Sequence, residues 1–238
     1  MTGSIEEVLS KLNSGDISVT GRLIDASNAT LYATCKNKDE EMICIYKPIA
    51  GERPLWDFPD GSLANREYLT FLLSHWLGLD IVPPTVLRDG PYGTGMVQQW
   101  IEIDQAIDLM EFFKQDDPRL RRIALLDLMV NNTDRKIGHL IPDLNGHVYG
   151  CDHGVTFHEE DKLRTVLWQW AGQAFTSEEL ETLEIAREYF LNSKLEIIAG
   201  LIDTTEIQAT ISRLDSAIKA RTFPNPNTEW PAVPWPPF

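Results

Sequence analysis

The periodicity of the apolar residues changes near residue 104, and this change limits the folds that the chain can adopt. Before that point, segments rich in β-branched and aromatic residues alternate with polar turns, a pattern typical of strands. Such segments lie within residues 17–34 (ISVTGRL and TLYATC) and at 42–47 (MICIYK), and the polar run KNKDEE connects the last two as a hairpin. We therefore expect an antiparallel sheet in the amino-terminal part.

One helix is expected to interrupt this strand pattern. Ser62 is a suitable N-cap and Gly78 a suitable end, and leucines and a tryptophan recur between them at helical spacing. Two further strands are expected at 86–87 and 95–101, separated by the turn sequence DGPYGTG. The first part of the chain is thus predicted to be a sheet with one helix.

Helical patterns predominate beyond residue 104. A helix is expected at 105–113 and another at 118–130. The second is apolar nearly all round over part of its length, which is typical of a buried helix, through Ile123, Ala124, Leu125, Leu126, Leu128 and Met129. Short strands at 139–141 and 147–151 flank the turn DLNG. Three more helices are expected to begin near Thr176, Ser193 and Asp203, and the first and third have a glutamate three residues on, the spacing of a capping box.

These patterns predict an α+β chain with two lobes. Residues 1–101 would form the sheet lobe, residues 102–221 a mostly helical lobe, and residues 222–238 a strap rich in proline and tryptophan that buries Trp230 and Trp235 on the helical lobe. A length of 238 residues suits such an arrangement, since a domain has about 150 residues. Binding sites of two-lobed proteins usually lie in the cleft between the lobes.

The charge of the chain argues against two classes of partner. The formal net charge is −15, so we expect neither nucleic acid binding nor stable membrane association. An apolar run of about 18 residues, which a membrane helix needs, is absent from the sequence. The first residues lack the apolar core of a secretory signal, and three cysteines cannot all pair internally, so a cytoplasmic location is expected.

Two charged residues of the first part suggest a nucleotide site. Lys47 ends a hydrophobic strand, and Glu67 lies on the predicted helix between Leu63 and Phe71, where its carboxylate needs a cation. A strand lysine paired with a helix glutamate contacts the α- and β-phosphates of ATP in protein kinases. A structural salt bridge is the alternative for this pair.

Two aspartates follow in the second part. Asp134 comes just after the buried helix, and Asp152 follows a short strand 18 residues later, so both can point into one cleft. Phosphoryl transfer uses one carboxylate to orient the attacking hydroxyl and another to hold Mg²⁺. Each segment alone is also an ordinary polar turn. The order of lysine, glutamate, Asn-x-Asp-Arg and Asp-x-Gly favours the kinase interpretation.

The segments NNTDRKIGHL and VYGCDHGVTF resemble the catalytic and metal-binding segments of the phosphatidylinositol 3-/4-kinase superfamily, especially type II phosphatidylinositol 4-kinases and HipA-type bacterial kinases. IYKP, the helix with Glu67 and RTVLWQWAG further resemble a largely actinobacterial family of distant kinship with those lipid kinases. The first resemblance covers mainly residues 42–157 and the second nearly the whole chain. Together they imply a two-lobed protein-kinase-like fold that binds ATP with Mg²⁺ or Mn²⁺.

The resemblance also implies roles for single residues. Lys47 would contact the phosphates, with Glu67 as its partner; Asp134 would be the catalytic aspartate and Asp152 the principal metal ligand. The hinge that meets the adenine would be formed by Gln98, Gln99 and Trp100.

Two departures from the pattern of the relatives concern metal and phosphate binding. His139 stands where the relatives have a metal-binding asparagine, and it offers nitrogen, which Mg²⁺ accepts less readily than oxygen. No glycine-rich loop follows the first strand, so Ser27 and Asn28 would have to cradle the phosphates.

The sequence therefore predicts an atypical kinase that transfers the γ-phosphoryl group of ATP to a hydroxyl of a soluble small-molecule or protein acceptor. A non-catalytic nucleotide-binding pseudokinase and a nucleotidyl transferase that moves AMP are alternatives. A metallohydrolase is a third, because His139, His147, His153 and His158 cluster near Cys151, although HExxH and paired CxxC motifs are absent. Lys162 and Arg164 would either meet an anionic acceptor or remain solvated charges.

Overall fold

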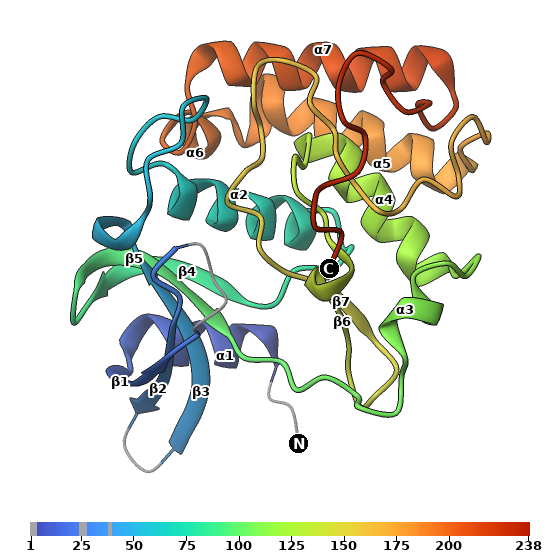
Figure 1. Cartoon of the computed structure of the whole chain (residues 1–238). Coiled ribbons are helices and arrows are strands. Elements are labelled where there is room, and N and C mark those ends of the chain that lie inside the picture. The colour runs from blue at the N-terminus through green and yellow to red at the C-terminus, as the bar shows by residue number, and fades with distance from the viewer. Residues whose placement is uncertain (1–3, 24–27, 38–39) are drawn as a thin grey trace.

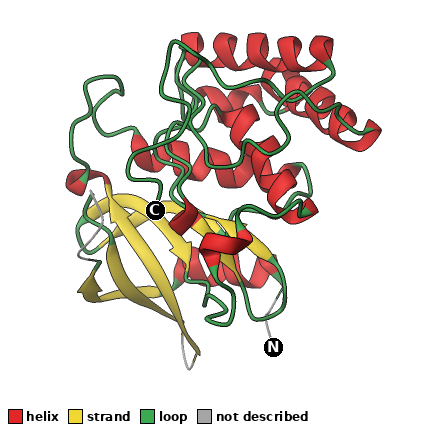
Figure 2. Ribbon diagram, turned by 45° about the vertical axis from the view of Figure 1, so that its right-hand side comes forward, coloured by secondary structure: helices red, strands yellow, loops and turns green. Residues whose placement is uncertain are grey.

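The amino-terminal half is built around one antiparallel sheet, as expected. The computed structural model describes residues 4–23, 28–37 and 40–238, so Ser27 lies outside the described residues. The strand order is β1-β2-β3-β5-β4, with β1 (Asp16–Arg22), β2 (Leu31–Asn37), β3 (Glu40–Pro48), β4 (Thr85–Gly90) and β5 (Gly93–Gln99). In both ribbon views the sheet lies at the lower left and most helices lie above it (Figures 1 and 2).

A helix that the sequence analysis did not predict precedes the sheet. This helix, α1 (Ile5–Ser14), begins with a capping box in which the Ser4 hydroxyl accepts from the Glu7 amide and the Glu7 carboxylate accepts from the Ser4 amide. Val8 and Leu12 are buried against the sheet. The capping-box spacing Ser-x-x-Glu is visible in the sequence and was the signal for this helix.

The remaining helices form the larger part of the molecule. They are α2 (Leu63–Trp76), α3 (Leu109–Phe112), α4 (Pro118–Val130), α5 (Ser177–Glu188), α6 (Leu195–Ala199) and α7 (Thr204–Ala220). The hairpin of β6 (Leu140–Pro142) and β7 (Val148–Gly150) separates α4 from α5. The predicted capping boxes at Thr176 and Asp203 are confirmed at the starts of α5 and α7.

Two predicted helices are shorter than expected. The predicted helix at 105–113 is reduced to α3, because the Asp104 carboxylate accepts from the Ala106 amide in a turn and Asp108 then caps a new start. The helix expected from Ser193 is reduced to the short α6, and the π-helical turn at Tyr189–Ser193 that precedes it continues α5. Of the described helices, none combines the length and the apolar composition needed to cross a bilayer.

The buried apolar residues form two clusters of unequal size. The smaller cluster lies between α1 and the sheet. The larger cluster is formed by the helical part, and it also contains Leu69, Phe71 and Leu73 of α2. Helix α2 therefore packs into the core of the helical part, although it lies between two strands in the sequence.

The carboxyl-terminal residues lie along the helical part. The Thr165 amide and the Trp168 indole both donate to the Ala232 carbonyl, at 3.0 and 2.8 Å, and the Ile137 amide donates to the Pro237 carbonyl at 2.8 Å. The red end of the chain is seen on this path in Figure 1. Burial of Trp235 was wrongly predicted, because its side chain is 86% exposed.

Candidate functional site

Lys47 is the point where three segments meet. Its ammonium donates to Glu67 Oε1 of α2 at 2.5 Å and to Asp152 Oδ1, just after β7, at 2.8 Å. Burial by itself would lower the pKa of Lys47, but the charges of Asp152 and Glu67 outweigh burial and raise it. The lysine is therefore held as a cation beside two carboxylates.

Asp152 connects Lys47 to His139. Its backbone φ is +59°, a left-handed conformation that aspartate tolerates better than most residues. The Lys47 ammonium holds the pKa of the Asp152 carboxyl well below its usual range, and His139 Nε2 lies 3.4 Å from the second carboxylate oxygen. Half of the Asp152 side chain is exposed, so its oxygens are accessible from the cleft.

His139 is a neutral imidazole in this environment. Burial lowers its pKa to about 4. Its Nδ1 accepts from the Lys136 amide at 3.4 Å, so the neutral ring carries its proton on Nε2, the nitrogen that faces Asp152. This arrangement suits a positioning contact with Asp152, and the metal-ligand role that the resemblance implies for His139 stays a prediction.

Asp134 follows α4 after a left-handed turn at Asn131. Its amide donates to Asn132 Oδ1 at 3.0 Å, and its carboxylate lies 3.2 Å from Lys136 Nζ. Burial raises the pKa of the Asp134 carboxyl, although Lys136 opposes this shift. A carboxylate of raised pKa is a stronger base than an ordinary aspartate. The sequence analysis did not single out Lys136. The signal that could have identified it is its position two residues after Asp134.

A buried polar framework joins the two aspartate-bearing segments. Arg135 is fully buried and donates to both carboxylate oxygens of Asp127 and, at 2.9 Å, to the Cys151 carbonyl. His153 Nε2 contacts the same guanidinium at 2.5 Å. The sequence analysis missed Asp127 because it stands among the apolar residues of the second half of α4.

An apolar cavity of about 320 Å³ opens on one side of the Lys47–Asp152 pair. It is lined mainly by Leu23, Thr30, Ile45, Trp100, Ile103 and Ile141. Gln98 and Gln99 also line it, but the amides of Gln99 and Trp100 donate to the carbonyls of Pro84 and Ile43. The expected hinge therefore borders the cavity, and these two amides are not available to a base.

A charged cavity of about 380 Å³ opens on the other side of the pair. Lys47, Glu67, Asp134 and Asp152 contribute to its wall, together with Asn28, whose side chain accepts from the Arg53 amide at 2.9 Å. Glu67 Oε2 is buried there and has no hydrogen-bond partner among the described residues. Because Lys47 and Asp152 line both cavities, one cleft has an apolar half and a charged half.

The other histidines do not join this site. His147 Nε2 contacts the Asp80 carbonyl at 2.8 Å, His153 faces Arg135, and His158 Nδ1 accepts from the Glu160 amide at 2.9 Å. Within the described ranges, no three His, Cys, Asp or Glu side chains are placed to hold a metal ion together. The histidine cluster of the sequence is thus spread over separate environments, which removes the basis for the metallohydrolase prediction.

The basic pair of the sequence is also divided. Lys162 is buried and pairs with Asp57 and Glu160, each at 3.1 Å, so it is not available to an acceptor. Arg164 is held beside the Asp134 segment by two backbone hydrogen bonds, from its amide to Asn132 and from the Arg135 amide to its carbonyl.

Comparison with known proteins identifies the fold. No protein-family model matches the sequence. The crystal structure of a Helicobacter pylori proinflammatory kinase, CtkA, is similar with a TM-score of 0.51 and 11% sequence identity, over 89% of this chain and 94% of that chain. The sheet and the helical part therefore form a kinase-like fold, and the predicted fold class is confirmed.

The comparison by sequence identifies the family. "Protein Rv2133c" of Mycobacterium tuberculosis (strain ATCC 25618 / H37Rv) is 38% identical over 262 aligned residues, which cover 95% of this chain and 94% of that protein. The predicted kinship with phosphatidylinositol 3-/4-kinases stays a prediction. The chain belongs to the same family as Rv2133c.

Proposed function

We propose that this protein is an ATP-dependent phosphotransferase that transfers the γ-phosphoryl group to a hydroxyl of an acceptor. The observation that carries the proposal is the position of Lys47, bonded to Glu67 and Asp152 where the apolar and charged halves of the cleft meet. The apolar half suits a purine, and the charged half suits phosphates and a cation.

Each charged residue has a role in this proposal. Lys47 binds the phosphates and Glu67 orients its ammonium. Asp134 orients the acceptor hydroxyl and takes its proton, as the raised pKa of its carboxyl favours. The hydroxyl oxygen forms a bond to the γ-phosphorus, the bond from that phosphorus to the β–γ bridging oxygen breaks, and ADP leaves.

The residues present fit a divalent cation. Mg²⁺ in ATP-dependent enzymes is usually held by one or two carboxylates and the substrate phosphates, without an all-protein cage. Asp152 and Asp134 line one cavity and supply carboxylate oxygens. Asp152 would be the principal ligand, and His139 would keep it oriented. When bound, the ion would neutralise charge on the β- and γ-phosphates.

The proposed acceptor is a soluble hydroxyl compound, either a small molecule or a protein side chain. A net charge of −15 opposes approach to an anionic bilayer. A cytoplasmic setting is part of this proposal, because it supplies ATP and keeps thiols reduced, and Cys35, Cys44 and Cys151 are free.

A nucleotide titration tests the proposal. The purified protein is titrated with ATP plus Mg²⁺, ATP plus Mn²⁺ and ATP alone, while thermal stability and the release of ADP or AMP are measured. The same series is run on Asp152→Asn and on Asp60→Asn, whose carboxylate is exposed in the loop before α2. We expect metal-dependent stabilisation that grows with the logarithm of the ATP concentration and is lost only in Asp152→Asn.

The products decide between the alternatives. Release of ADP supports the proposed kinase function. Release of AMP would instead indicate a nucleotidyl transferase. Stabilisation without turnover, across small-molecule and protein acceptors, would indicate a pseudokinase. No response to any nucleotide would overturn the assignment.

A further inference from the structure

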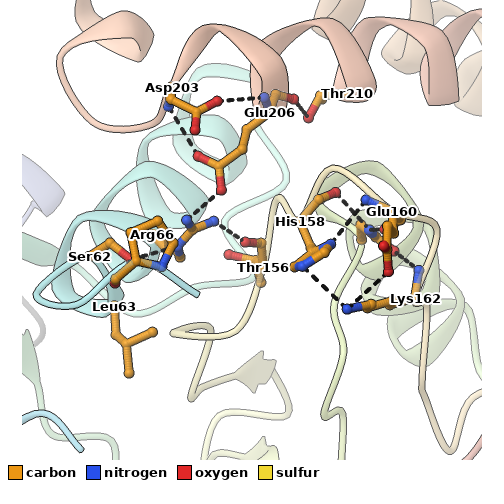
Figure 3. A network of polar contacts seen from close by, with 12 residues as sticks. Ser62, Leu63, Arg66, Thr156, His158, Glu160, Lys162, Asp203, Glu206 and Thr210 are labelled. Carbon is orange, nitrogen blue, oxygen red and sulfur yellow. Dashed lines mark hydrogen bonds and ion pairs between the residues drawn. The ribbon is translucent and has the colours of Figure 1, made fainter. Parts of the chain in front are cut away.

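Helix α2 carries two adjacent charged residues that contact different parts of the molecule. Glu67 contacts Lys47 of the sheet, whereas Arg66 points into the helical part and is only 1% exposed. The Arg66 guanidinium donates to Glu206 of α7 and, at 2.6 Å, to the Thr156 carbonyl. Figure 3 shows Arg66 between these two partners. One side chain thus joins α2 to two other segments.

Both partners of Arg66 are themselves held in place. Glu206 closes the capping box of α7: its second carboxylate oxygen accepts from the Asp203 amide at 3.0 Å, and its own amide donates to Asp203 at 2.9 Å. The Thr156 hydroxyl donates to the His153 carbonyl at 2.9 Å, one residue after Asp152. Arg66 is therefore anchored to a fixed helix start and to the segment that carries Asp152.

We propose that Arg66, through its ion pair with Glu206, is a positioning residue that sets the rotation of α2 and so keeps Glu67 on Lys47. Consecutive helical residues point about 100° apart on one rigid helix, so a rotation that releases Arg66 also moves Glu67. The inference rests on the proposed function, because it assigns Arg66 a role in assembling the charged half of the cleft.

Stability alone is a poor explanation for this ion pair. Removing two charges from water costs about as much as their attraction returns, and an apolar pair of equal volume serves stability as well. The large core already attaches α2 to the helical part through Leu69, Phe71 and Leu73. The ion pair adds a fixed rotation of α2 about its axis, because the planar guanidinium of Arg66 must contact Glu206 and Thr156 at the same time.

The protein contains a matched control pair. Arg121 of α4 donates to both carboxylate oxygens of Glu179, at 2.6 and 2.8 Å, and Glu179 closes the capping box of α5 with Thr176. Arg66 and Arg121 each lie 4.8 Å from the centre of a phenylalanine ring. Among the residues that the structure describes, the side-chain hydrogen bonds of Arg121 reach only positions 173–179, away from α2.

The experiment compares Glu206→Gln with Glu179→Gln in the full chain. Glutamine can keep each capping box with its one remaining oxygen, and it replaces the charge and the second acceptor oxygen by an amide NH2 that cannot accept from the arginine. We expect Glu206→Gln to weaken ATP–Mg²⁺ binding about tenfold, which is about 1.4 kcal/mol, and Glu179→Gln to leave it within about twofold. Binding is measured below the unfolding transition of every variant, so that equal losses of thermal stability do not affect the result. Arg66→Lys, which keeps a cation without the planar fork, should weaken binding in the same direction.

A double-mutant cycle with Glu67→Gln separates positioning from a general structural effect. If Arg66 acts through Glu67, Glu206→Gln causes no further loss of ATP affinity in the Glu67→Gln background. Equal losses in Glu206→Gln and Glu179→Gln, or additive losses with Glu67→Gln, would overturn the inference.

A readout without nucleotide keeps this inference distinct from the proposed function. The rate of Lys47 acetylation by acetic anhydride, followed by peptide mass spectrometry, reports how firmly its ammonium is paired. We expect a rise of about tenfold in Glu206→Gln and none in Glu179→Gln, because the reagent reaches the Lys47 amine only when its contact with Glu67 opens. If the wild-type protein binds no ATP but Lys47 responds in this way, the proposed function fails and the positioning role stands. An unchanged acetylation rate in Glu206→Gln overturns the positioning role.

Discussion

The two halves of the cleft are built by different means. The apolar half is lined by side chains such as Leu23, Ile45 and Ile141, which need only the right size and shape. The charged half depends on groups that are paired with one another, and removing one partner leaves a buried charge without compensation. Substitutions in the charged half should therefore have large effects, and conservative changes in the apolar half small ones.

The largest effect is expected from Lys47→Met. The substitution leaves Glu67 buried without its cation, so the free energy of unfolding should fall by about 3–5 kcal/mol, and ATP binding should be lost. Denaturant unfolding and ATP titration measure the two effects. Lys11→Met is the control, because Lys11 pairs with the exposed Glu40 and the loss of a solvent-screened pair should change stability little. Retained ATP affinity in Lys47→Met would show that the charged half does not hold the phosphates.

The second prediction separates chemistry from binding within the charged half. Asp134→Asn should lower turnover by about 10²–10⁴-fold, the usual contribution of a general base, with little change in ATP affinity. The same variant should be more stable than the wild type at pH 7, because burial makes the ionised Asp134 unfavourable in the folded state. Steady-state kinetics and thermal unfolding test these statements, and an unchanged turnover would remove Asp134 from the mechanism.

The pH dependence gives the third prediction. The pKa of Asp134 is raised in the folded protein, so the folded state binds its proton more readily than the unfolded state. The contribution of Asp134 to stability therefore increases as the pH falls through its folded-state pKa, and Asp134→Asn should lack this component. Turnover of the wild type should decline over the same range, at a higher pH than an ordinary aspartate would give. If turnover instead declines at the pKa of an ordinary carboxylate, this expectation is contradicted.

A more moderate effect is expected from His139→Asn. Asparagine places an amide oxygen beside Asp152, and changes next to a metal ligand commonly alter metal affinity about 10–100-fold. We expect the preference for Mg²⁺ over Mn²⁺ in ATP-linked stabilisation to rise by about tenfold, the low end of that range. His147→Asn, in the β6–β7 hairpin, serves as the control. Identical metal preferences in the two variants would show that His139 does not influence metal binding.

The smallest effect is expected in the apolar half. Ile45→Val removes one methylene group from the cavity wall, so ATP binding should weaken by about 0.8 kcal/mol, or about fourfold. The measurement is the same ATP titration. A loss as large as that of Lys47→Met would remove the distinction between the two halves.

Much of the site was predictable from the sequence, although the way it is assembled was not. Lys47, which was predicted to contact the phosphates, is found in contact with its predicted partner Glu67 and with the predicted metal ligand Asp152. Prediction was less accurate for buried ion pairs, whose partners come from different segments of the chain. The Asp127–Arg135 pair spans a turn after α4, and Lys162 was expected in a solvated or acceptor-facing position but pairs with Asp57, more than one hundred residues away.

The sequence by itself determined the local elements of this protein. The capping boxes at Thr176 and Asp203, the β2–β3 hairpin and helix α4 depend on residues only a few positions apart, and their patterns can be read directly. Only the tertiary structure decided that α2 packs into the helical core and that Arg66 meets Glu206, 140 positions later. These contacts join residues far apart in the sequence, and they depend on where the connecting loops place each segment in space. The spacing of residues within one segment does not determine that placement.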